Sequence, residues 1–346
     1  MLLQISIPTF NRFASLQPLL NALKSQISQR LSNLDACRVV VFDNCSTDVD
    51  YINLCENDVF KLSNFEYVRH LSGLGMEGNI LSCYEQAQAD YVWIFGDDDM
   101  PAQGLVGAVI DLLSSAKPDM LYLDSKWEDQ TSVLKVASLL AMPPQWNCVN
   151  TPLQLARSAG TSLTFLSSVV IRKSVLTQSG VSTRALEGTQ MPQMAWVLSA
   201  LKEEAYLIKS TTACIVASRG NSGGYKVLDV FAQRYPEALH KFEQRMDLQV
   251  AKALRRDLIQ NYLPGLIYQL KNESLGRFDS AEKMPYTTSL SKYLSYKLLK
   301  WMHDRTNTNL FRWYAFLSKA VYRLSCVVRL ESLQLKAKRF AARRKF

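Results

Sequence analysis

The stretch YVWIFGDDD, residues 91–99, joins five apolar residues to a glycine and three consecutive carboxylates. An apolar run without alternation is typical of a strand that is buried on both faces. The acids mark the carboxyl end of that strand. In open α/β sheets, ligands bind outside the carboxyl ends of the strands, near the point where the strand order reverses. The stretch therefore predicts both an α/β fold and the edge of the sheet that carries a site.

Similar strands alternate with helices around this stretch, over the first 125 residues. Apolar, β-branched runs predict strands, and apolar residues spaced by three and four predict helices. Such alternation implies a Rossmann-like, mostly parallel twisted sheet with flanking helices. The predicted strands are 3–7, 38–42, 65–68, 91–95 and 120–123, and the predicted helices are 12–28, 76–88 and 102–115.

The rest of the chain divides into two further regions. Residues 126–227 are less regular, with one strand-like run at 168–171. From about residue 228 the pattern is helical, with almost no strand signal. We therefore predict three parts, namely 1–125, 126–227 and a mainly helical 228–346. Hydrophobic residues make up 48% of the 346 residues and charged residues 21%, which excludes a disordered or collagen-like protein.

The net charge of +9 is concentrated at one end of the chain. Residues 282–346 hold 15 Lys and Arg against 3 Asp and Glu, whereas residues 1–281 hold 25 against 28. This asymmetry argues against a protein that binds nucleic acid through a uniformly basic surface. It predicts a local anionic partner for the C-terminal region, such as a membrane surface.

The seven cysteines are scattered and form no CxxC pair. This pattern predicts reduced thiols in a cytosolic compartment, and neither a disulfide framework nor a zinc site. The N-terminus lacks the basic region of a signal peptide. No stretch approaches about 20 uncharged apolar residues, so a spanning helix is not expected.

Three adjacent carboxylates, Asp97, Asp98 and Asp99, repel one another unless a cation or hydrogen-bond donors neutralise them. Oxygen ligands suit Mg²⁺ or Mn²⁺, and Mg²⁺ often joins one or two carboxylates to substrate phosphates. One interpretation is thus a divalent cation that holds a diphosphate. The alternative is a helix N-terminus where acids favour the helix dipole.

Polar residues also follow the first two predicted strands. Pro8-Thr9-Phe10-Asn11-Arg12 closes the first, and Arg12 offers a planar fork of donors for phosphate. Asp43 and Asn44 close the second and could bond a base or ribose edge. The alternatives are a capped helix start and an Asx turn.

Four segments together resemble the family 2 glycosyltransferases of the GT-A fold. They are ISIPTFNR (5–12), VVVFDNCSTD (39–48), GLGMEGNILSCYEQA (73–87) and DYVWIFGDDD (90–99). The resemblance implies transfer of a sugar from a nucleotide-diphosphate donor to an acceptor hydroxyl, with Mg²⁺ or Mn²⁺. Residues 1–125 would then be the nucleotide-sugar-binding half and 126–227 the acceptor-binding, catalytic half.

A weaker similarity to abequosyltransferase-like members, which build bacterial O-antigen, extends over FLSSVVIRKS (165–174), GTQMPQ (188–193) and ASRGNS (217–222). Those members often carry a His after the proline, where this chain has Gln193. Any role of that His in acceptor binding or base catalysis is therefore not expected here.

The family resemblance implies the following donor-site residues. The nucleotide would be bordered by Pro8, Thr9, Asn11 and Arg12. The base would form hydrogen bonds with Asp43, with Asn44 beside it. The donor would also lie near Asn79, Asp97 and Asp98. The metal ligand would be Asp98 or Asp99. Either Asp97 and Asp99 are the outer residues of the family's D-x-D motif, or Gly96 takes the first place and Asp98 is the ligand.

A carboxylate on the face opposite the leaving diphosphate should take the acceptor proton as general base. The family implies an acid in the second half of the chain, and Glu187 is the best placed by sequence, ahead of Asp124 and Glu128. The alternative for Glu187 is a solvated loop residue. Inversion at the anomeric carbon is likewise implied by the resemblance.

The C-terminal region interleaves aromatic and leucine residues with Lys and Arg between residues 293 and 324. This pattern predicts amphipathic basic helices that bind anionic lipid headgroups. With the resemblance it implies a cytoplasmic enzyme, peripheral on the inner membrane, with a lipid-linked saccharide acceptor. The alternative is a helical subdomain with a solvated basic face.

Two other functions compete with the transferase. A sugar nucleotidyltransferase usually needs a glycine-rich phosphate loop after its first strand, and residues 8–11 contain no glycine. A non-catalytic protein that binds polyanions through its basic tail would bind with steep salt dependence even without the three aspartates.

Overall fold

The computed structural model describes residues 1–28, 36–52, 54, 58–140, 145–149, 151–219, 225–272, 284–285, 290, 293–305 and 309–325. Its centre is a nine-stranded sheet in the order β3-β2-β1-β4-β8-β6-β9-β5, with β7 beside β9. The strands are β1 (Leu3–Thr9), β2 (Cys37–Asp43), β3 (Phe65–Arg69), β4 (Tyr91–Ile94), β5 (Met100–Pro101), β6 (Met120–Glu128), β7 (Trp146–Val149), β8 (Val169–Arg172) and β9 (Leu207–Ser218).

The sheet is parallel over its first half and mixed beyond β4. β1 pairs in parallel with β2 and β4, and β2 pairs in parallel with β3. β8 then lies antiparallel between β4 and β6, and β9 is parallel to β6. The predicted α/β fold is confirmed, but the sequence does not predict β9, which contacts β5, β6 and β7.

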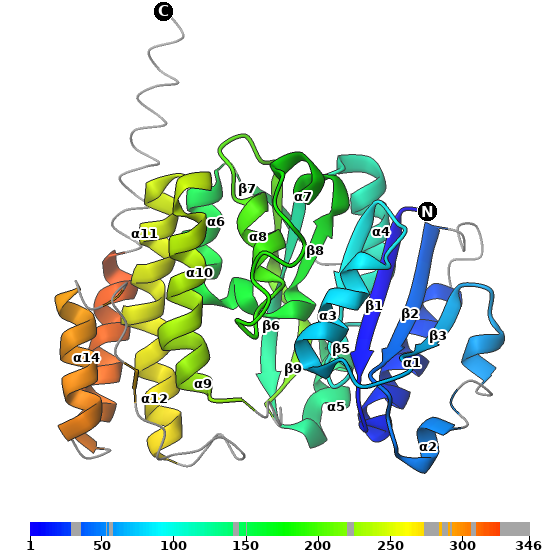
Figure 1. Ribbon diagram of the computed structural model, residues 1–346, viewed down its shortest axis with the longest axis horizontal. Helices are drawn as coiled ribbons and strands as arrows, with labels where there is room; N and C mark the ends of the chain where they lie inside the picture. The colour runs from blue at the N-terminus through cyan, green and yellow to red at the C-terminus, as the bar shows by residue number, and fades with distance from the viewer. Residues whose placement is uncertain are drawn as a thin grey trace, which may run out of the picture.

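Helices cover both faces of the sheet, as Figure 1 shows. The continuous apolar run of β2 explains why, because Val39 and Val41 enter one hydrophobic core while Val40 and Phe42 enter the other. The first core holds α1 (Phe13–Ser28), α4 (Leu105–Ala116) and α5 (Val133–Leu139). The second holds α3 (Gly75–Glu85), α6 (Pro152–Ala159), α7 (Lys173–Ser179) and α8 (Met194–Ala200).

A helical region follows β9 and lies beside the sheet at the end remote from β3 (Figure 1). Its helices are α9 (Val227–Asp229), α10 (Tyr235–Phe242), α11 (Leu248–Asp257), α12 (Leu263–Lys271) and α14 (Leu294–Arg305), and residues 309–325 are also helical. Leu254, Leu258 and Phe311 belong to the same core as Val40 and Phe42. The helical region therefore packs on the sheet through a shared core.

None of the described helices is both long and apolar enough to cross a bilayer. The basic segment 326–346, which carries much of the positive charge, lies outside the described residues. Residues 220–222 of the ASRGNS segment also lie outside them.

Candidate active site

The strand order places a switch point between β1 and β4. From β1 the chain moves outward to β2 and β3, and then returns to add β4 on the other side of β1. The carboxyl ends of these parallel strands meet at the lower edge of the sheet in Figure 1. Thr9 ends β1, and the three aspartates follow β4. The two segments therefore lie where a doubly wound sheet binds its ligands.

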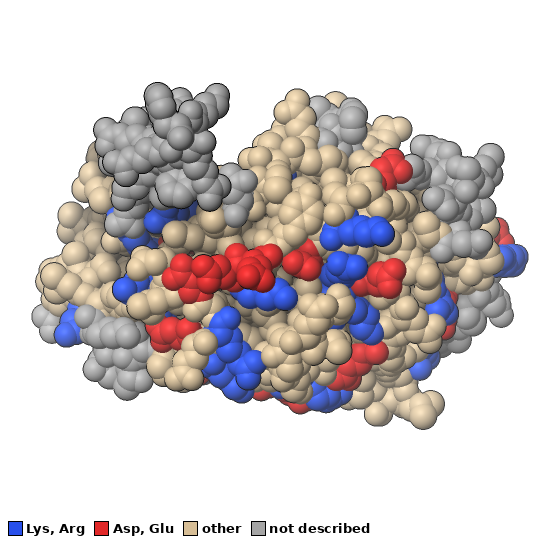
Figure 2. Space-filling view, turned by 90° about the horizontal axis from the view of Figure 1, so that it is seen from above, with Lys and Arg blue, Asp and Glu red and all other residues tan. Residues whose placement is uncertain are grey.

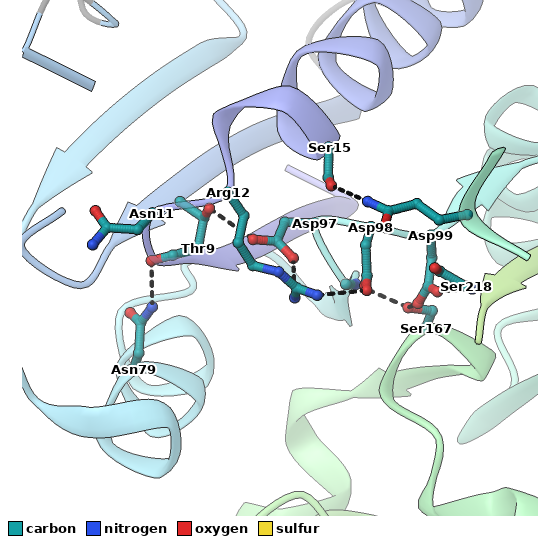
Figure 3. Close-up of polar contacts among 12 residues, drawn as sticks. Thr9, Asn11, Arg12, Ser15, Asn79, Asp97, Asp98, Asp99, Ser167 and Ser218 are labelled. Carbon is teal, nitrogen blue, oxygen red and sulfur yellow. Dashed lines mark hydrogen bonds and ion pairs between the residues drawn. The ribbon is translucent and has the colours of Figure 1, made fainter. Parts of the chain in front are cut away.

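Arg12 joins two of the three aspartates, as Figure 3 shows. Its Nη1 donates to Asp97 Oδ1 and its Nη2 to Asp98 Oδ2, each over 2.8 Å. The other Asp97 oxygen accepts a hydrogen bond of 2.8 Å from Thr9 Oγ1. Side-chain exposure is 28% for Arg12, 4% for Asp97 and 8% for Asp98. The guanidinium thus lies on the solvent side of a nearly buried pair of carboxylates.

Hydrogen bonds fix the backbone of residues 11 and 12 and thereby orient the Arg12 side chain. Asn11 has a left-handed conformation, with φ of 50°, and its N–H donates to Ser46 Oγ. The Arg12 N–H donates to the hydroxyl of Tyr51, which lies in α2 (Val49–Ile52) and also contacts Thr9 Oγ1 at 2.5 Å. Asn tolerates this conformation better than most residues. The turn therefore directs Arg12 across the end of β1 toward β4.

Asp99 turns away from Arg12 and is held by two segments of the second half, namely the 3-10 turn Leu166–Ser168 before β8 and the end of β9. Ser167 Oγ donates to one carboxylate oxygen over 2.5 Å, and the Ser218 N–H donates to the other over 3.1 Å. Ser167 Oγ also accepts the Gly96 N–H at 2.8 Å. The sequence does not predict these contacts. They depend on the antiparallel pairing of β8 with β4 and of β9 with β5, which brings distant segments of the chain together.

Burial changes the acidity of this cluster. It is the largest cause that raises the pKa of Asp97 to about 6; Arg12 opposes the shift and Asp98 adds to it. Burial likewise raises the pKa of Asp99 well above its usual range, with the Asp98 charge next in importance. Without a further positive charge, the cluster is therefore electrostatically unfavourable in its fully ionised form.

The three aspartates offer the kind of ligand atoms that a divalent cation binds. The ligand atoms on offer are all oxygens, as Mg²⁺ and Mn²⁺ prefer. A Cβ on residue 96 would lie 2.7 Å from Asp99 Oδ2 and 3.4 Å from Asp98 Oδ1, so Gly96 leaves room for the carboxylates to fold over it. Within the described part of the chain, no three His, Cys, Asp or Glu residues are grouped to hold a metal by themselves. One or two carboxylates could bind the cation, with phosphate oxygens completing its shell.

The other predicted donor-site residues reach the same edge, where they organise loops. Asp43 accepts hydrogen bonds from the Ser46 N–H, the Tyr67 hydroxyl and Arg69 Nη1. Asn44 Oδ1 accepts the Leu74 N–H. Asn79 Nδ2 donates to the Phe42 carbonyl at 2.9 Å, and Asn79 Oδ1 faces His70 Nε2. Pro8 lies within β1 opposite Phe42 of β2.

The predicted catalytic acids are less closely tied to this cluster. Glu187 pairs with Arg184, which also binds Glu85 at the far end of α3. Asp124 pairs with Lys209, and Glu128 with Lys126. No described contact joins these three acids to Arg12 or the aspartates. The role of Glu187 therefore stays a prediction.

Comparison with known proteins gives the affiliation of the chain. The family model described as "Glycosyl transferase family 2" matches residues 4–176. Abequosyltransferase RfbV of Salmonella typhimurium (strain LT2) is 27% identical over 240 residues, which cover 65% of this chain and 69% of that protein.

Two solved structures show the same fold. S. aureus TarS 1-349 in complex with UDP-GlcNAc has a TM-score of 0.52 and 15% identity, and the match covers 94% of this chain and 92% of that one. The mannosyltransferase PcManGT from Pyrobaculum calidifontis, in complex with GDP-Man and Mn²⁺, has a TM-score of 0.51 and 14% identity, with 92% and 86% coverage. At such identities the likeness concerns the fold. Because the family match spans half of the chain, including β1 to β4 and the three aspartates, the chain belongs to glycosyl transferase family 2 and is a glycosyltransferase of the GT-A fold.

Proposed function

We propose that the enzyme moves a sugar from a nucleotide-diphosphate donor to an acceptor hydroxyl, with Mg²⁺ or Mn²⁺ at the three aspartates. The observation that carries this proposal is the Arg12–Asp97–Asp98 cluster at the switch point between β1 and β4. It offers an anion-binding guanidinium beside cation-binding carboxylates, which is what a metal diphosphate requires.

The donor would lie along the edge formed by Pro8, Thr9, Asn11 and Arg12, with its base near Asp43 and Asn44 and its sugar toward Asn79 and Asp97. The position of Arg69 supports this arrangement, because the buried Asp43 carboxylate and the Ser46 carbonyl hold its exposed guanidinium at this edge. The N–H groups of a guanidinium can donate to the acceptors on the edge of a base.

We assign the metal contact to Asp98, the register in which Gly96 takes the first place of the D-x-D motif. Both oxygens of Asp97 and both of Asp99 accept hydrogen bonds within the protein, whereas one Asp98 oxygen is engaged by Arg12. The bound cation would stabilise negative charge on the leaving diphosphate.

In the proposed reaction, the bond between the anomeric carbon and the diphosphate oxygen breaks, and that oxygen keeps the electron pair. The acceptor oxygen forms the new bond on the opposite face, which inverts the anomeric carbon, and its proton passes to a carboxylate. Glu187 is proposed for this role, with Asp124 and Glu128 as alternatives. Glu187 would have to exchange its partner Arg184 for the acceptor, which its exposed position allows.

The proposed acceptor is a lipid-linked saccharide of bacterial O-antigen or another surface polysaccharide. The similarity to abequosyltransferase RfbV agrees with the resemblance to O-antigen transferases on which this acceptor is proposed. Two helices of the C-terminal region support a lipid surface. α14 exposes Leu294, Leu298 and Trp301 along one side, and residues 309–325 expose a second such stripe.

The exposed apolar stripe of helix 309–325 lies on a different side of the helix from the residues that pack on the core. Phe311, Ala315 and Tyr322 are buried, whereas Leu310, Trp313, Leu317, Val321 and Leu324 are more than half exposed at helical spacing. Arg312, Lys319 and Arg323 lie among them in the sequence and are exposed. Apolar side chains flanked by basic ones suit a bilayer with anionic headgroups. We therefore propose a peripheral enzyme on the cytoplasmic face of the inner membrane.

One face of the molecule is mixed in charge. Figure 2 shows Asp and Glu side chains among the Lys and Arg side chains of this face, so that the basic residues there form no continuous patch. This distribution favours a membrane contact confined to the C-terminal helices over general binding of polyanions.

The test is a thermal-shift screen of UDP-, GDP-, dTDP- and CDP-sugars, each with Mn²⁺ and with EDTA. A donor should raise the melting temperature only when Mn²⁺ is present, because ligand binding stabilises the folded state by mass action. The same donor should then release its nucleoside diphosphate in a metal-dependent assay. Absence of any stabilising donor, or full turnover in EDTA, would overturn the proposal.

Two variants test the register in this assay. Asp98→Asn should abolish the Mn²⁺-dependent shift and reduce turnover by several orders of magnitude. Asp99→Asn should lower the melting temperature of the free protein and keep part of the Mn²⁺-dependent shift. If Asp99→Asn alone loses the shift, the metal contact belongs to Asp99.

A further inference from the structure

Arg12 lies where an incoming cation would meet the carboxylates. Its guanidinium bridges Asp97 and Asp98 from the solvent side, and it is the most exposed of the three side chains. The turn at Asn11 and the hydrogen bond from the Arg12 N–H to Tyr51 hold it there. A positive charge already neutralises the oxygens that a divalent cation would use.

A cation that approached alone could bind both oxygens of Asp98 only after it displaced Arg12 from one of them. The displaced guanidinium would lose its charge-assisted hydrogen bond to Asp98, and such bonds are among the strong ones in proteins. It would also remain close to a second positive ion, because its backbone is fixed by Ser46 and Tyr51. Both effects oppose the binding of a free cation at this edge.

A diphosphate removes this opposition. It presents pairs of anionic oxygens to the planar guanidinium fork, which binds phosphate in bidentate fashion. It also brings its own oxygens to complete the shell of the cation. When a diphosphate arrives, Arg12 can exchange one anionic partner for another while Asp98 becomes available.

We propose that Arg12 acts as a resident cation that makes metal binding conditional on the diphosphate. In the free enzyme Arg12 occupies the Asp97–Asp98 pair and keeps the affinity for Mn²⁺ low. The donor diphosphate draws the guanidinium onto its phosphates, so that cation and nucleotide bind synergistically. This inference rests on the proposed function, because it assumes that a metal diphosphate is the ligand of the site.

The experiment measures Mn²⁺ binding to the full chain by electron paramagnetic resonance of free Mn²⁺, without any turnover. Titrations are made alone and with whichever of UDP, GDP, dTDP or CDP stabilises the wild-type protein most. For the wild type, the nucleotide should tighten Mn²⁺ binding at least tenfold beyond the affinity of Mn²⁺ for the nucleotide itself. Arg12→Ala should bind Mn²⁺ alone about tenfold more tightly than the wild type and lose most of the tightening.

Two further variants show whether a change in Mn²⁺ affinity is specific to the Arg12 guanidinium. Arg12→Lys keeps one charge without the fork and should give an intermediate affinity, which covers the case in which Arg12→Ala does not fold. Arg38→Ala removes a guanidinium from the opposite edge of the sheet, where Arg38 at the start of β2 binds Glu66, and should leave both the affinity for Mn²⁺ alone and its tightening by nucleotide unchanged.

The possible failures are distinguishable. If the wild type binds nucleotide with Mn²⁺ but both Arg12 variants bind Mn²⁺ alone no more tightly, Arg12 is a permanent structural ion pair and the inference is wrong. Equal Mn²⁺ affinity of the wild type with and without nucleotide leads to the same conclusion. If no nucleoside diphosphate binds the wild type in any condition, the proposed function itself fails.

Discussion

Asp99 is buried and is held by the second half of the chain. Its two oxygens accept hydrogen bonds from Ser167 and from the Ser218 backbone, and both partners come from the second half of the chain. Ser167 also binds the Gly96 N–H at the start of the same turn. One hydroxyl therefore fixes the turn that presents the carboxylates, and its loss should affect stability and metal binding together.

Substitution Ser167→Ala tests this role. It leaves the buried Asp99 oxygen and the Gly96 N–H without their partner, which costs about 1–3 kcal/mol of the free energy of unfolding. We expect that loss in urea denaturation, together with a weaker Mn²⁺-dependent thermal shift. The matched control is Ser199→Ala, since Ser199 is also buried but donates to the Ala195 carbonyl of its own helix. An equal loss of the Mn²⁺-dependent shift in both variants would contradict the assignment.

The raised pKa of Asp97 predicts a stability that falls as the pH rises. Its folded pKa of about 6 exceeds the ordinary 3.8, so the folded state binds this proton more tightly than the unfolded state. The stabilisation is complete below pH 4 and is lost as the pH rises through 6. The free energy of unfolding should thus decrease by about 1 kcal/mol between pH 5 and pH 7.5.

Urea denaturation in EDTA at these two pH values measures the effect. Asp97→Asn cannot titrate at this position and should show a smaller decrease than the wild type. If both proteins lose the same amount, the titration of Asp97 does not account for the dependence.

The site illustrates which contacts a sequence can predict. Arg12 and the three aspartates are visible because they follow strand ends in recognisable segments. Tyr51 and Ser218 contribute a hydroxyl and a backbone N–H, which have no sequence signal of their own. Their contribution depends on how segments far apart in the chain pack together, so only the structure reveals it.

At the scale of secondary structure elements, the glycine that ends α6 has a specific role. Gly160 has φ of +53°, and a Cβ there would lie 2.2 Å from Asp257 Oδ2 at the end of α11. That carboxylate accepts hydrogen bonds from the Thr161 N–H and Oγ1. The absence of a side chain at residue 160 therefore lets α11 dock on the helices of the second half.

Substitution Gly160→Ala should destabilise the protein more than Gly180→Ala. Gly180 has a similar φ of +65° but open space around its Cβ position, so its substitution carries only backbone strain of about 1 kcal/mol. Gly160 has ψ of −133°, outside the left-handed region in which Gly180 lies, so a side chain there meets more backbone strain. The collision with Asp257 adds to it, and we expect a further loss of at least about 2 kcal/mol. Urea denaturation of the two variants gives the comparison. Equal losses would show that the collision is relieved at no cost.

The strands also show where prediction from sequence ends. Runs such as 38–42 and 91–95 lie in interior strands with uniform apolar character, and the structure has strands at both places. β9 was not predicted because Lys209, Ser210, Thr211 and Thr212 interrupt its apolar pattern. Its pairing with β6 shifts register beside this interruption, between Tyr122 and Ser125. A strand that changes partners and register lacks the simple periodicity on which sequence reasoning depends.

For the whole molecule, the shared core limits how the C-terminal region can be tested. Leu254, Leu258, Leu263 and Phe311 are buried in the core that also contains Val40 of the sheet. Removal of the helical region would expose this core, so a truncated chain would report on folding as well as on membrane binding. Point substitutions on exposed side chains separate the two effects.

The double substitution Trp313→Gln, Leu317→Gln tests the proposed membrane surface. Both side chains are more than half exposed on helix 309–325 and should leave the fold unchanged when replaced. Full burial of each apolar side chain contributes about 1.5–3 kcal/mol. We expect the double variant to bind vesicles of phosphatidylglycerol and phosphatidylcholine at least tenfold more weakly than the wild type in cosedimentation.

The control carries the same chemical change on another helix. Leu134 and Leu139 of α5 are also more than half exposed, and Leu134→Gln, Leu139→Gln should bind vesicles as the wild type does. Because the headgroup attraction is screened by salt while apolar insertion is not, wild-type binding should weaken but persist at 0.5 M NaCl. Complete loss of wild-type binding in salt, with no difference between the two double variants, would indicate that only the charges contact the membrane. If the wild type and both double variants bind uncharged vesicles equally well, neither the apolar stripe of helix 309–325 nor its basic residues account for membrane binding.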